Sequence, residues 1–238
     1  MRAAGTAAGA NAAATAKRIS ARERLLHLPV WFSLGMACDM TGVPKETLQV
    51  YLHRWKKMGV VESFGLKTGV YFNRVLEPKS RIETRVRALK WLYPEAMLVG
   101  DTILNAAGWT TQIPRQLHVA IIDQRTAHRL NGVRLHLRSR SWFARACRPA
   151  RAGRGLVPAG QGETGLALAE LRPAWALADQ IRRGQEPDAD DLEWDEIDAA
   201  AVLEAGKRLG ARESRILDYL KDCADCAANF NFRGLGNR

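Results

Sequence analysis

The segment spanning residues 31–74 constrains the fold of this chain more than any other part of the sequence. Apolar residues recur at helical spacing after Ser33, and Gly42 follows them with the backbone freedom that a sharp turn needs. Pro44 suits the first position of a helix, because its missing N–H has no intrahelical partner there. The pattern therefore predicts two helices joined by a tight turn over residues 41–43.

The second of these helices is predicted to be amphipathic and basic. Its apolar residues recur at i, i+3, i+4 and i+7 and are expected to pack inward: Leu48, Tyr51, Leu52, Trp55 and Met58. At about 100° per residue, polar and basic side chains fall on the opposite side of the helix. The helix is expected to end at Gly59, before two β-rich runs that surround the glycine-flanked loop 65–69.

Two helices with a tight turn and a following hairpin are typical of a winged helix-turn-helix, a module that binds duplex DNA. The first residues of its second helix contact base edges, and later basic residues contact phosphates. We expect base contacts from Lys45, Thr47, Gln49 and His53, phosphate contacts from Arg54 and Lys57, and phosphate or minor-groove contacts from Lys67 and Thr68 in the loop. Winged helices also bind proteins, so a protein-interaction module is an alternative.

The charge of the chain is distributed unevenly. The net charge is +11 over 238 residues, but residues 161–238 carry a net charge of −6 and residues 1–160 a net charge of +17. A basic N-terminal part followed by an acidic C-terminal part fits a nucleic-acid binder that has a separate surface for support or for a partner. A basic surface without any ligand would show the same distribution.

The ends of the sequence carry few chemical signals. Residues 1–19 are rich in Ala and Gly and are expected to form a disordered tail. The chain has neither a leucine-rich signal segment nor a run of 18 apolar residues, so we expect a cytoplasmic protein without a membrane span. Cys223 and Cys226 have zinc-knuckle spacing, but no second ligand pair follows, so no metal site is predicted.

Beyond residue 80 the periodicity changes repeatedly between helix and strand. A helix is expected over residues 81–93, strands over residues 117–122 and 133–138, and helices over residues 164–184 and 188–209. The second strand alternates apolar and basic residues, so its solvent-facing side offers possible secondary phosphate contacts from Arg134, His136, Arg138 and Arg140.

The central segment from Tyr93 to Ile121 resembles the AbiEi family of antitoxins and transcriptional regulators. The resemblance lies in a helix of small residues, the Gly108-Trp109 step and the Ile113-Pro114 pair before a strand. Members of that family pair a DNA-binding winged helix with an α/β C-terminal domain. The resemblance implies a regulator that binds repeats in its own promoter and represses an operon encoding a nucleotidyltransferase-like toxin, whose action it also counters.

Taken together, the pattern and the resemblance predict an α+β protein in four parts. A disordered tail at 1–19 precedes a winged helix-turn-helix at 20–76, a mixed α/β antitoxin-like domain at 81–185 and a helical extension at 186–238. The resemblance does not extend beyond residue 186. The expected partners are double-stranded DNA and a cognate toxin, while the oligomeric state is left open.

The alternative to a DNA-binding regulator is an enzyme, a metal-dependent nuclease with a restriction-endonuclease-like core. Asp101 and Asp123 each follow an apolar segment and would hold Mg²⁺, with Arg125 orienting water. An arginine cannot readily deprotonate, which weakens that role, and both acids are also explained as cap or turn residues. The chain has no Walker-type phosphate loop, zinc-protease motif or hydrolase motif. A Gly-x-Gly-x-x-Gly match at residues 160–165 is interpreted as a flexible turn, because no convincing strand precedes it. We therefore expect a regulator without catalytic activity or a cofactor.

Overall fold

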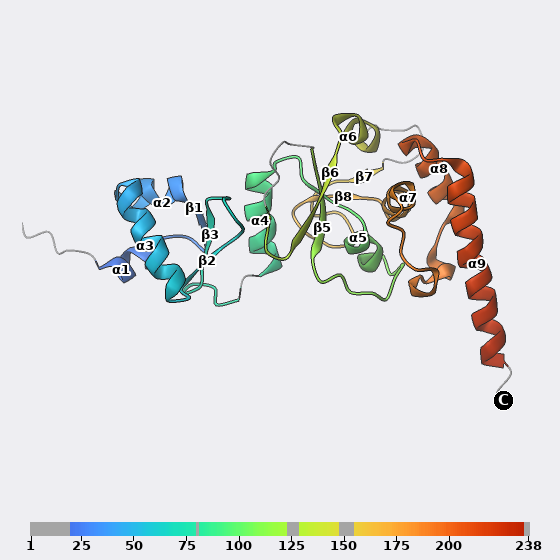
Figure 1. Ribbon diagram of the computed structural model, residues 1–238, viewed down its shortest axis with the longest axis horizontal. Coiled ribbons are helices and arrows are strands. Elements are labelled where there is room, and N and C mark those ends of the chain that lie inside the picture. The colour runs from blue at the N-terminus through green and yellow to red at the C-terminus, as the bar shows by residue number, and fades with distance from the viewer. Residues whose placement is uncertain (1–19, 80, 123–128, 148–154, 236–238) are drawn as a thin grey trace, which may run out of the picture.

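A computed structural model describes residues 20–79, 81–122, 129–147 and 155–235 of the chain. The protein is elongated, and Figure 1 shows helices α1–α3 at one end, α9 at the other, and helix α4 between the two sheets. It is an α+β protein with one antiparallel and one mixed sheet. The predicted tail at 1–19 lies outside the described residues.

The N-terminal unit contains three helices and a three-stranded sheet. Its elements in chain order are α1 (Ala21–Leu26), β1 (Trp31–Ser33), α2 (Leu34–Thr41), α3 (Lys45–Lys57), β2 (Val61–Ser63) and β3 (Val70–Asn73). The strand order is β1-β3-β2, and both pairs are antiparallel. Ser33 caps α2 by accepting a hydrogen bond from the Met36 amide, and Gly42 ends α2 at a φ of 63°, as the turn requires. Strand β1 was not expected from the sequence.

Strand β3 divides its side chains between two hydrophobic cores, because successive residues of a strand point to opposite faces. Tyr71 packs against the first core, whereas Val70 and Phe72 belong to the second core. The first core contains Leu25, Leu28, Phe32, Ala37, Val43, Leu48, Leu52, Trp55 and Val61. The sheet of the N-terminal unit is therefore covered on both faces, and one of those faces contacts the rest of the chain.

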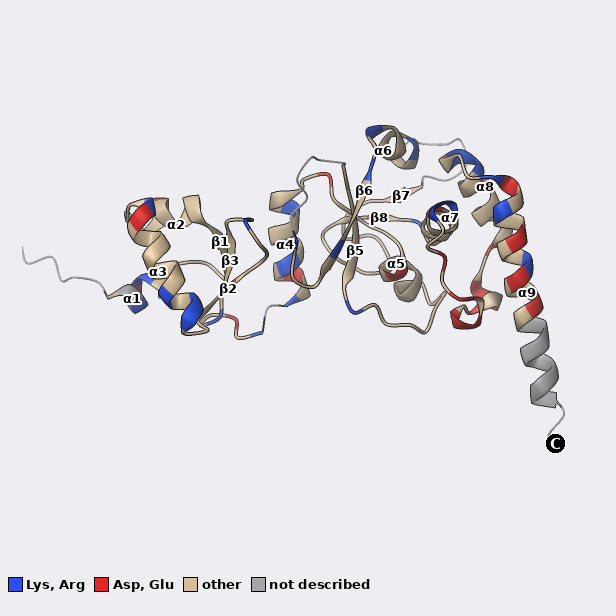
Figure 2. Ribbon diagram, viewed as in Figure 1, with Lys and Arg blue, Asp and Glu red and all other residues tan. Residues whose placement is uncertain are grey.

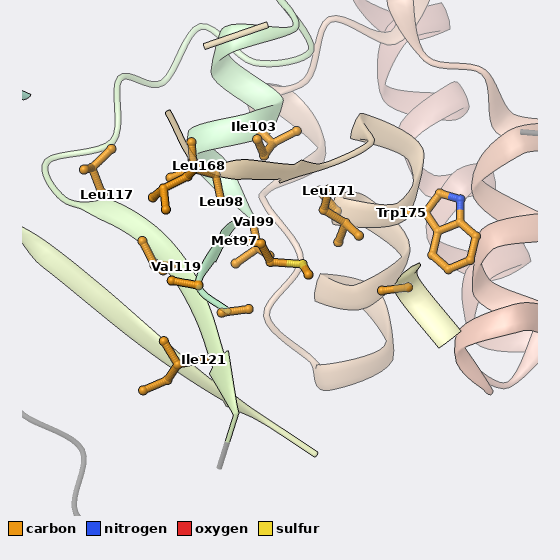
Figure 3. Close-up of a cluster of buried hydrophobic side chains, with 14 of the residues drawn as sticks. Met97, Leu98, Val99, Ile103, Leu117, Val119, Ile121, Leu168, Leu171 and Trp175 are labelled. Carbon is orange, nitrogen blue, oxygen red and sulfur yellow. The ribbon is translucent and has the colours of Figure 1, made fainter. Parts of the chain in front are cut away.

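The second part of the chain is built around a mixed five-stranded sheet. Its first elements are α4 (Ile82–Leu92), β4 (Met97–Leu98), α5 (Asp101–Ala106), β5 (Leu117–Ile122), β6 (Val133–Arg138) and α6 (Arg140–Cys147). They are followed by β7 (Leu156–Val157), β8 (Ala169–Leu171) and α7 (Pro173–Arg183). The strand order is β6-β5-β4-β8-β7, with β5–β6 and β4–β8 parallel and the other pairs antiparallel. Figure 3 shows side chains of β4, β5 and β8 packed in the core with Ile103 and Trp175.

The C-terminal helices pack onto α7 and share the second core. They are α8 (Ala199–Leu209) and α9 (Glu213–Leu235), preceded by two short 3-10 turns, η1 (Ala189–Asp191) and η2 (Trp194–Glu196). Val202, Leu209 and Ile216 are buried in the same cluster as the sheet residues. The region predicted as an extension is thus helical and joined to the preceding core.

Two predicted helices begin later than expected. The helix predicted at 164–184 is preceded by strand β8, and α7 starts only at Pro173. The helix predicted at 188–209 begins at Ala199, where the Asp198 side chain caps it by accepting a hydrogen bond from the Ala201 amide. Acidic residues favour a helix start in general, but the run before Asp198 forms the two 3-10 turns instead.

The β2–β3 hairpin is fixed to the segment that precedes β6. The Leu66 amide donates to the Arg129 carbonyl at 3.2 Å, and the Asn131 amide donates to the Phe64 carbonyl at 2.8 Å. Arg85 of α4 adds a hydrogen bond to the Asn131 carbonyl at 2.8 Å. These contacts join the N-terminal unit to the second sheet through backbone atoms.

No helix among the described residues has both the length and the apolar character required to cross a bilayer.

Candidate nucleic-acid interface

Helix α3 separates its buried and exposed side chains as its periodicity predicts. Leu48, Leu52 and Trp55 are at most 2% exposed and face the first core. Met58 was expected inside but is 63% exposed, because it stands at the C-cap, beyond the last helical turn. The residues assigned to base or phosphate contacts on this helix are all exposed: Lys45, Thr47, Gln49, His53, Arg54 and Lys57.

These six side chains are also free of contacts that would hold them elsewhere. None of them forms a side-chain hydrogen bond or an ion pair with any part of the chain that the structure describes. An intramolecular partner would have to be given up before a ligand could bind, at a cost in free energy. The outer face of α3 can therefore contact a ligand without breaking internal bonds.

The hairpin loop is more restricted than the sequence suggested. Thr68 is only 9% exposed, and its hydroxyl donates to the Gly65 carbonyl and accepts from the Val70 amide, each at 3.2 Å. The expectation that Thr68 contacts DNA is corrected, because the loop uses this hydroxyl for its own turn. Lys67 remains exposed, with a positive φ of 59°.

Strand β6 also departs from the prediction of an open basic face. Arg138 is 4% exposed and forms a buried ion pair with Asp179 of α7, at 2.5 Å between Nη2 and Oδ2. Its donors bind Asp179 and the Leu137 carbonyl, so Arg138 does not present the open, solvent-facing phosphate contact that the alternation of the strand predicted. The strand alternation identified its face correctly but gave no sign that α7 covers the end of that face.

The other three residues of that predicted basic face lie in different environments. Arg134 is exposed on β6, whereas Arg140 is exposed at the start of α6 and does not continue the strand. His136 is half-buried, and its Nε2 has no hydrogen-bond partner among the described residues. Burial, followed by the charges of His118, Arg138, Arg134 and Arg183, lowers the pKa of His136 to about 3.

Asp101, the first of the two acids in the nuclease hypothesis, belongs to a small polar cluster. Asp101 Oδ2 lies 3.5 Å from His118 Nδ1, and Asp101 Oδ1 accepts from Gln180 Nε2 at 2.5 Å. Burial lowers the pKa of His118, and the neighbouring Asp101 opposes that effect. Asp123 and Arg125 lie outside the described residues. Among the described residues, no group of three or more His, Cys, Asp or Glu side chains is arranged to hold a metal ion.

The two cysteines with zinc-knuckle spacing lie on α9. Cys223 is buried and Cys226 is partly exposed, and both are free thiols. Burial is the main cause that raises the pKa of Cys223, which keeps its thiol protonated at neutral pH.

Residues at two places were assigned no contact from the sequence. Val50 is 49% exposed on the outer face of α3, where an apolar side chain can contact a thymine methyl group. Arg145, Arg182 and Arg183 gather near Arg138, although these four residues come from one strand, β6, and two helices, α6 and α7. The adjacent Arg182 and Arg183 at the end of α7 were the one sign of this cluster in the sequence. Basic residues are also favoured at a helix C-terminus by the helix dipole, which explains this pair equally well.

Charge is distributed along the length of the molecule. Figure 2 shows Lys and Arg on α3 and α4, while Asp and Glu gather between α7 and α8 and along α9, at the far end from α3. The acidic run 186–196 therefore does not lie beside the exposed face of α3.

No protein-family model matches this chain, and no curated protein matches it either. Among solved structures, the crystal structure of the RV2827C protein from Mycobacterium tuberculosis is similar in fold, with a TM-score of 0.54 and 14% sequence identity. The alignment covers 87% of this chain and 75% of that chain. The likeness therefore extends over both parts of the molecule, and at this identity it concerns the fold alone.

Proposed function

We propose that residues 20–76 form a winged helix-turn-helix and that the protein is a sequence-specific DNA-binding transcriptional regulator. The observation that carries the proposal is helix α3, whose basic outer face is exposed and unpaired while its apolar face is buried. The order of helices and strands around α3 supports it, because this order is typical of such modules.

The division of roles along α3 follows from helix geometry. A helix that enters the major groove brings its N-terminal residues to the base edges, where an amide such as Gln49 can pair with adenine. Arg54 and Lys57 lie one to three turns farther along and reach the phosphates, which attract them irrespective of sequence. Lys67, at the tip of the hairpin, adds a further phosphate contact.

The finer proposal is an autorepressing antitoxin that counters a nucleotidyltransferase-like toxin. It is supported by the resemblance of the segment from Tyr93 to Ile121 to the AbiEi family. The acidic end of the molecule, remote from α3, leaves a separate surface for such a partner.

DNA binding is tested by fluorescence anisotropy with duplexes from the region upstream of the gene. Arg54→Ala and Lys57→Ala are each expected to weaken binding to every sequence, because each removes a phosphate contact. Lys221→Ala on α9 removes the same charge from an exposed position and is the matched control, expected to change affinity less than twofold. Affinity should also fall steeply with salt, and each α3 variant should reduce that slope by about one.

Equal losses in Arg54→Ala and Lys221→Ala would show a general charge effect and would refute the role of α3. Absence of binding to any upstream duplex, together with capture of a tight protein partner, would favour the protein-interaction module. The antitoxin proposal is tested separately by co-expression with the adjacent open reading frame. It predicts that this frame encodes a nucleotidyltransferase whose growth inhibition the protein relieves.

A further inference from the structure

A small cavity beside the end of β6 is lined by four arginines. Its volume is about 230 Å³, and Arg138, Arg145, Arg182 and Arg183 surround it together with Leu137, Ser139, Trp142 and Leu209. These residues come from β6, α6, α7 and α8. No carboxylate lines the cavity among the described residues. Four like charges that converge on one space repel one another, so their arrangement needs an explanation.

Asp179 is the acid that pairs with two of these arginines, and its acceptor capacity is used up. Its carboxylate accepts from Arg138 at 3.0 and 2.5 Å, from the Trp142 indole at 2.8 Å, and from Arg182 at 3.3 and 3.0 Å. Asp179 is 2% exposed, so these bonds form in a region of low dielectric, where they are strong. Asp179 therefore balances Arg138 and Arg182 only in part and has no lone pair left for Arg183.

Two arginines keep unused donors at the cavity. Arg145 donates one N–H, at 3.0 Å, to the carbonyl of Leu209, the last residue of α8. Arg183 makes no hydrogen bond or ion pair with the parts of the chain that the structure describes. A guanidinium carries five N–H donors, so the cavity retains many more donors than acceptors.

A second observation beside the cavity agrees with this excess of positive charge. His136 does not line the cavity, but it precedes Arg138 by two residues on the same face of β6, and its buried Nε2 has no hydrogen-bond partner in the part of the chain that the structure describes. The charges around it come from several elements: Arg134 and Arg138 of β6, His118 of β5 and Arg183 of α7. All of them disfavour a proton on His136 and lower its pKa.

The geometry points to an anion site in this cavity, and we propose that it takes the phosphate group of a small phosphorylated molecule. A phosphate offers several oxygen acceptors to guanidinium groups, which bind it with charge-assisted and often paired hydrogen bonds. The partly open cavity leaves the remainder of the molecule in solvent. The proposal is independent of the function assigned to α3, because the site uses no residue of the N-terminal unit.

The test is calorimetric titration of the full chain with inorganic phosphate, and then with nucleoside monophosphates, at constant ionic strength. Saturable binding is expected, together with a rise in the melting temperature, since a ligand that binds only the folded state stabilises it. Arg183→Gln should weaken binding at least tenfold. Arg183 is exposed and unpaired, so this variant is expected to fold normally. Arg87→Gln, an exposed arginine on α4 outside the cavity, is the matched control and should change affinity less than twofold.

Three results would overturn the proposal: no saturable heat with phosphate or with any nucleotide, equal losses in the two variants, or loss of duplex DNA affinity in Arg183→Gln to the same extent as phosphate affinity. The last result would assign the cavity to a DNA phosphate. DNA binding through α3 is measured by the Lys57→Ala variant, so failure of one proposal is distinguishable from failure of the other.

Discussion

Individual residues show how the surroundings of a charge decide its role. Arg138 and Arg134 lie on the same face of one strand, yet Arg134 is exposed while Arg138 is buried against Asp179. Taking two charges out of water is costly, and their pairing offsets that cost only when both partners are present. The alternation in the sequence predicts the face of each arginine but not whether a helix covers it.

Removal of the Asp179 carboxylate should destabilise the fold strongly. Asp179→Ala leaves Arg138 buried without its partner, and we expect a loss of about 3–5 kcal/mol in the free energy of unfolding. Urea denaturation followed by circular dichroism measures it. Glu204→Ala, which breaks the exposed pair with Arg208 on α8, should cost at most about 0.5 kcal/mol. A loss below 1 kcal/mol in Asp179→Ala would contradict this account of the buried pair.

The stability of the protein should fall in mild acid because of His136. Its pKa is lowered to about 3 in the folded state, against an ordinary value of about 6.5 in an unfolded chain. The unfolded state therefore binds more protons between these values, and stability decreases as the pH falls through 6.5. At pH 5 this group contributes a loss of up to about 2 kcal/mol relative to neutral pH.

The pH dependence is checked with urea midpoints between pH 7 and pH 4. His136→Asn removes one titrating group and should flatten the dependence in part, because burial also lowers the pKa of the neighbouring His118. Identical profiles for the wild type and His136→Asn would show that this histidine does not govern the acid sensitivity.

At the scale of elements, helix α3 was the most predictable part of the structure. Its apolar period of 3.6 residues dictates which face is buried, because that face can leave water only by packing against a neighbour. The 188–209 segment was less predictable: its acids favour a helix start, but Asp198 supplies the cap and the helix begins there. The cap is a local hydrogen bond, and several acids in the run were equally able to supply it.

Within α3, Gln49 should determine preference for a single base pair. Gln49→Ala removes one paired contact to a base edge, which is worth about 1–3 kcal/mol of discrimination. Competition with duplexes varied at one position at a time should show relaxed preference at one base pair and little loss elsewhere. Lys57→Ala is the comparison, because a lost phosphate contact weakens all sequences alike. A uniform loss in Gln49→Ala would place this residue at the backbone.

For the whole molecule, the contact between the hairpin and the second sheet is the decisive feature. Phe64, Val70 and Phe72 of the N-terminal unit are buried in the second core, and backbone hydrogen bonds join the hairpin to residues 129–131. The domain boundary predicted between residues 76 and 81 therefore does not separate the two cores, since the hairpin before it already packs on both.

This contact requires a glycine at position 65. A Cβ there would lie 2.1 Å from the Arg129 carbonyl oxygen, so Gly65→Ala forces the two backbones apart. We expect a loss of about 1–3 kcal/mol and faster proteolysis between the two parts of the chain. Gly35→Ala in α2 meets no atom closer than 3.8 Å and should be neutral or stabilising by about 0.5–1 kcal/mol. Equal stability of the two variants would contradict a close backbone approach at Gly65.

The sequence by itself determined the amphipathic helix α3, its turn at Gly42 and the two strands β5 and β6, because periodicity and turn chemistry act between residues close in the chain. Only the tertiary structure decided that Thr68 turns inward, that Arg138 pairs with Asp179 and that four arginines share a cavity. Those outcomes depend on contacts between residues such as Arg138 and Asp179, which are 41 positions apart. No local pattern fixes which distant helix covers a strand, since many partners could bury the same surface.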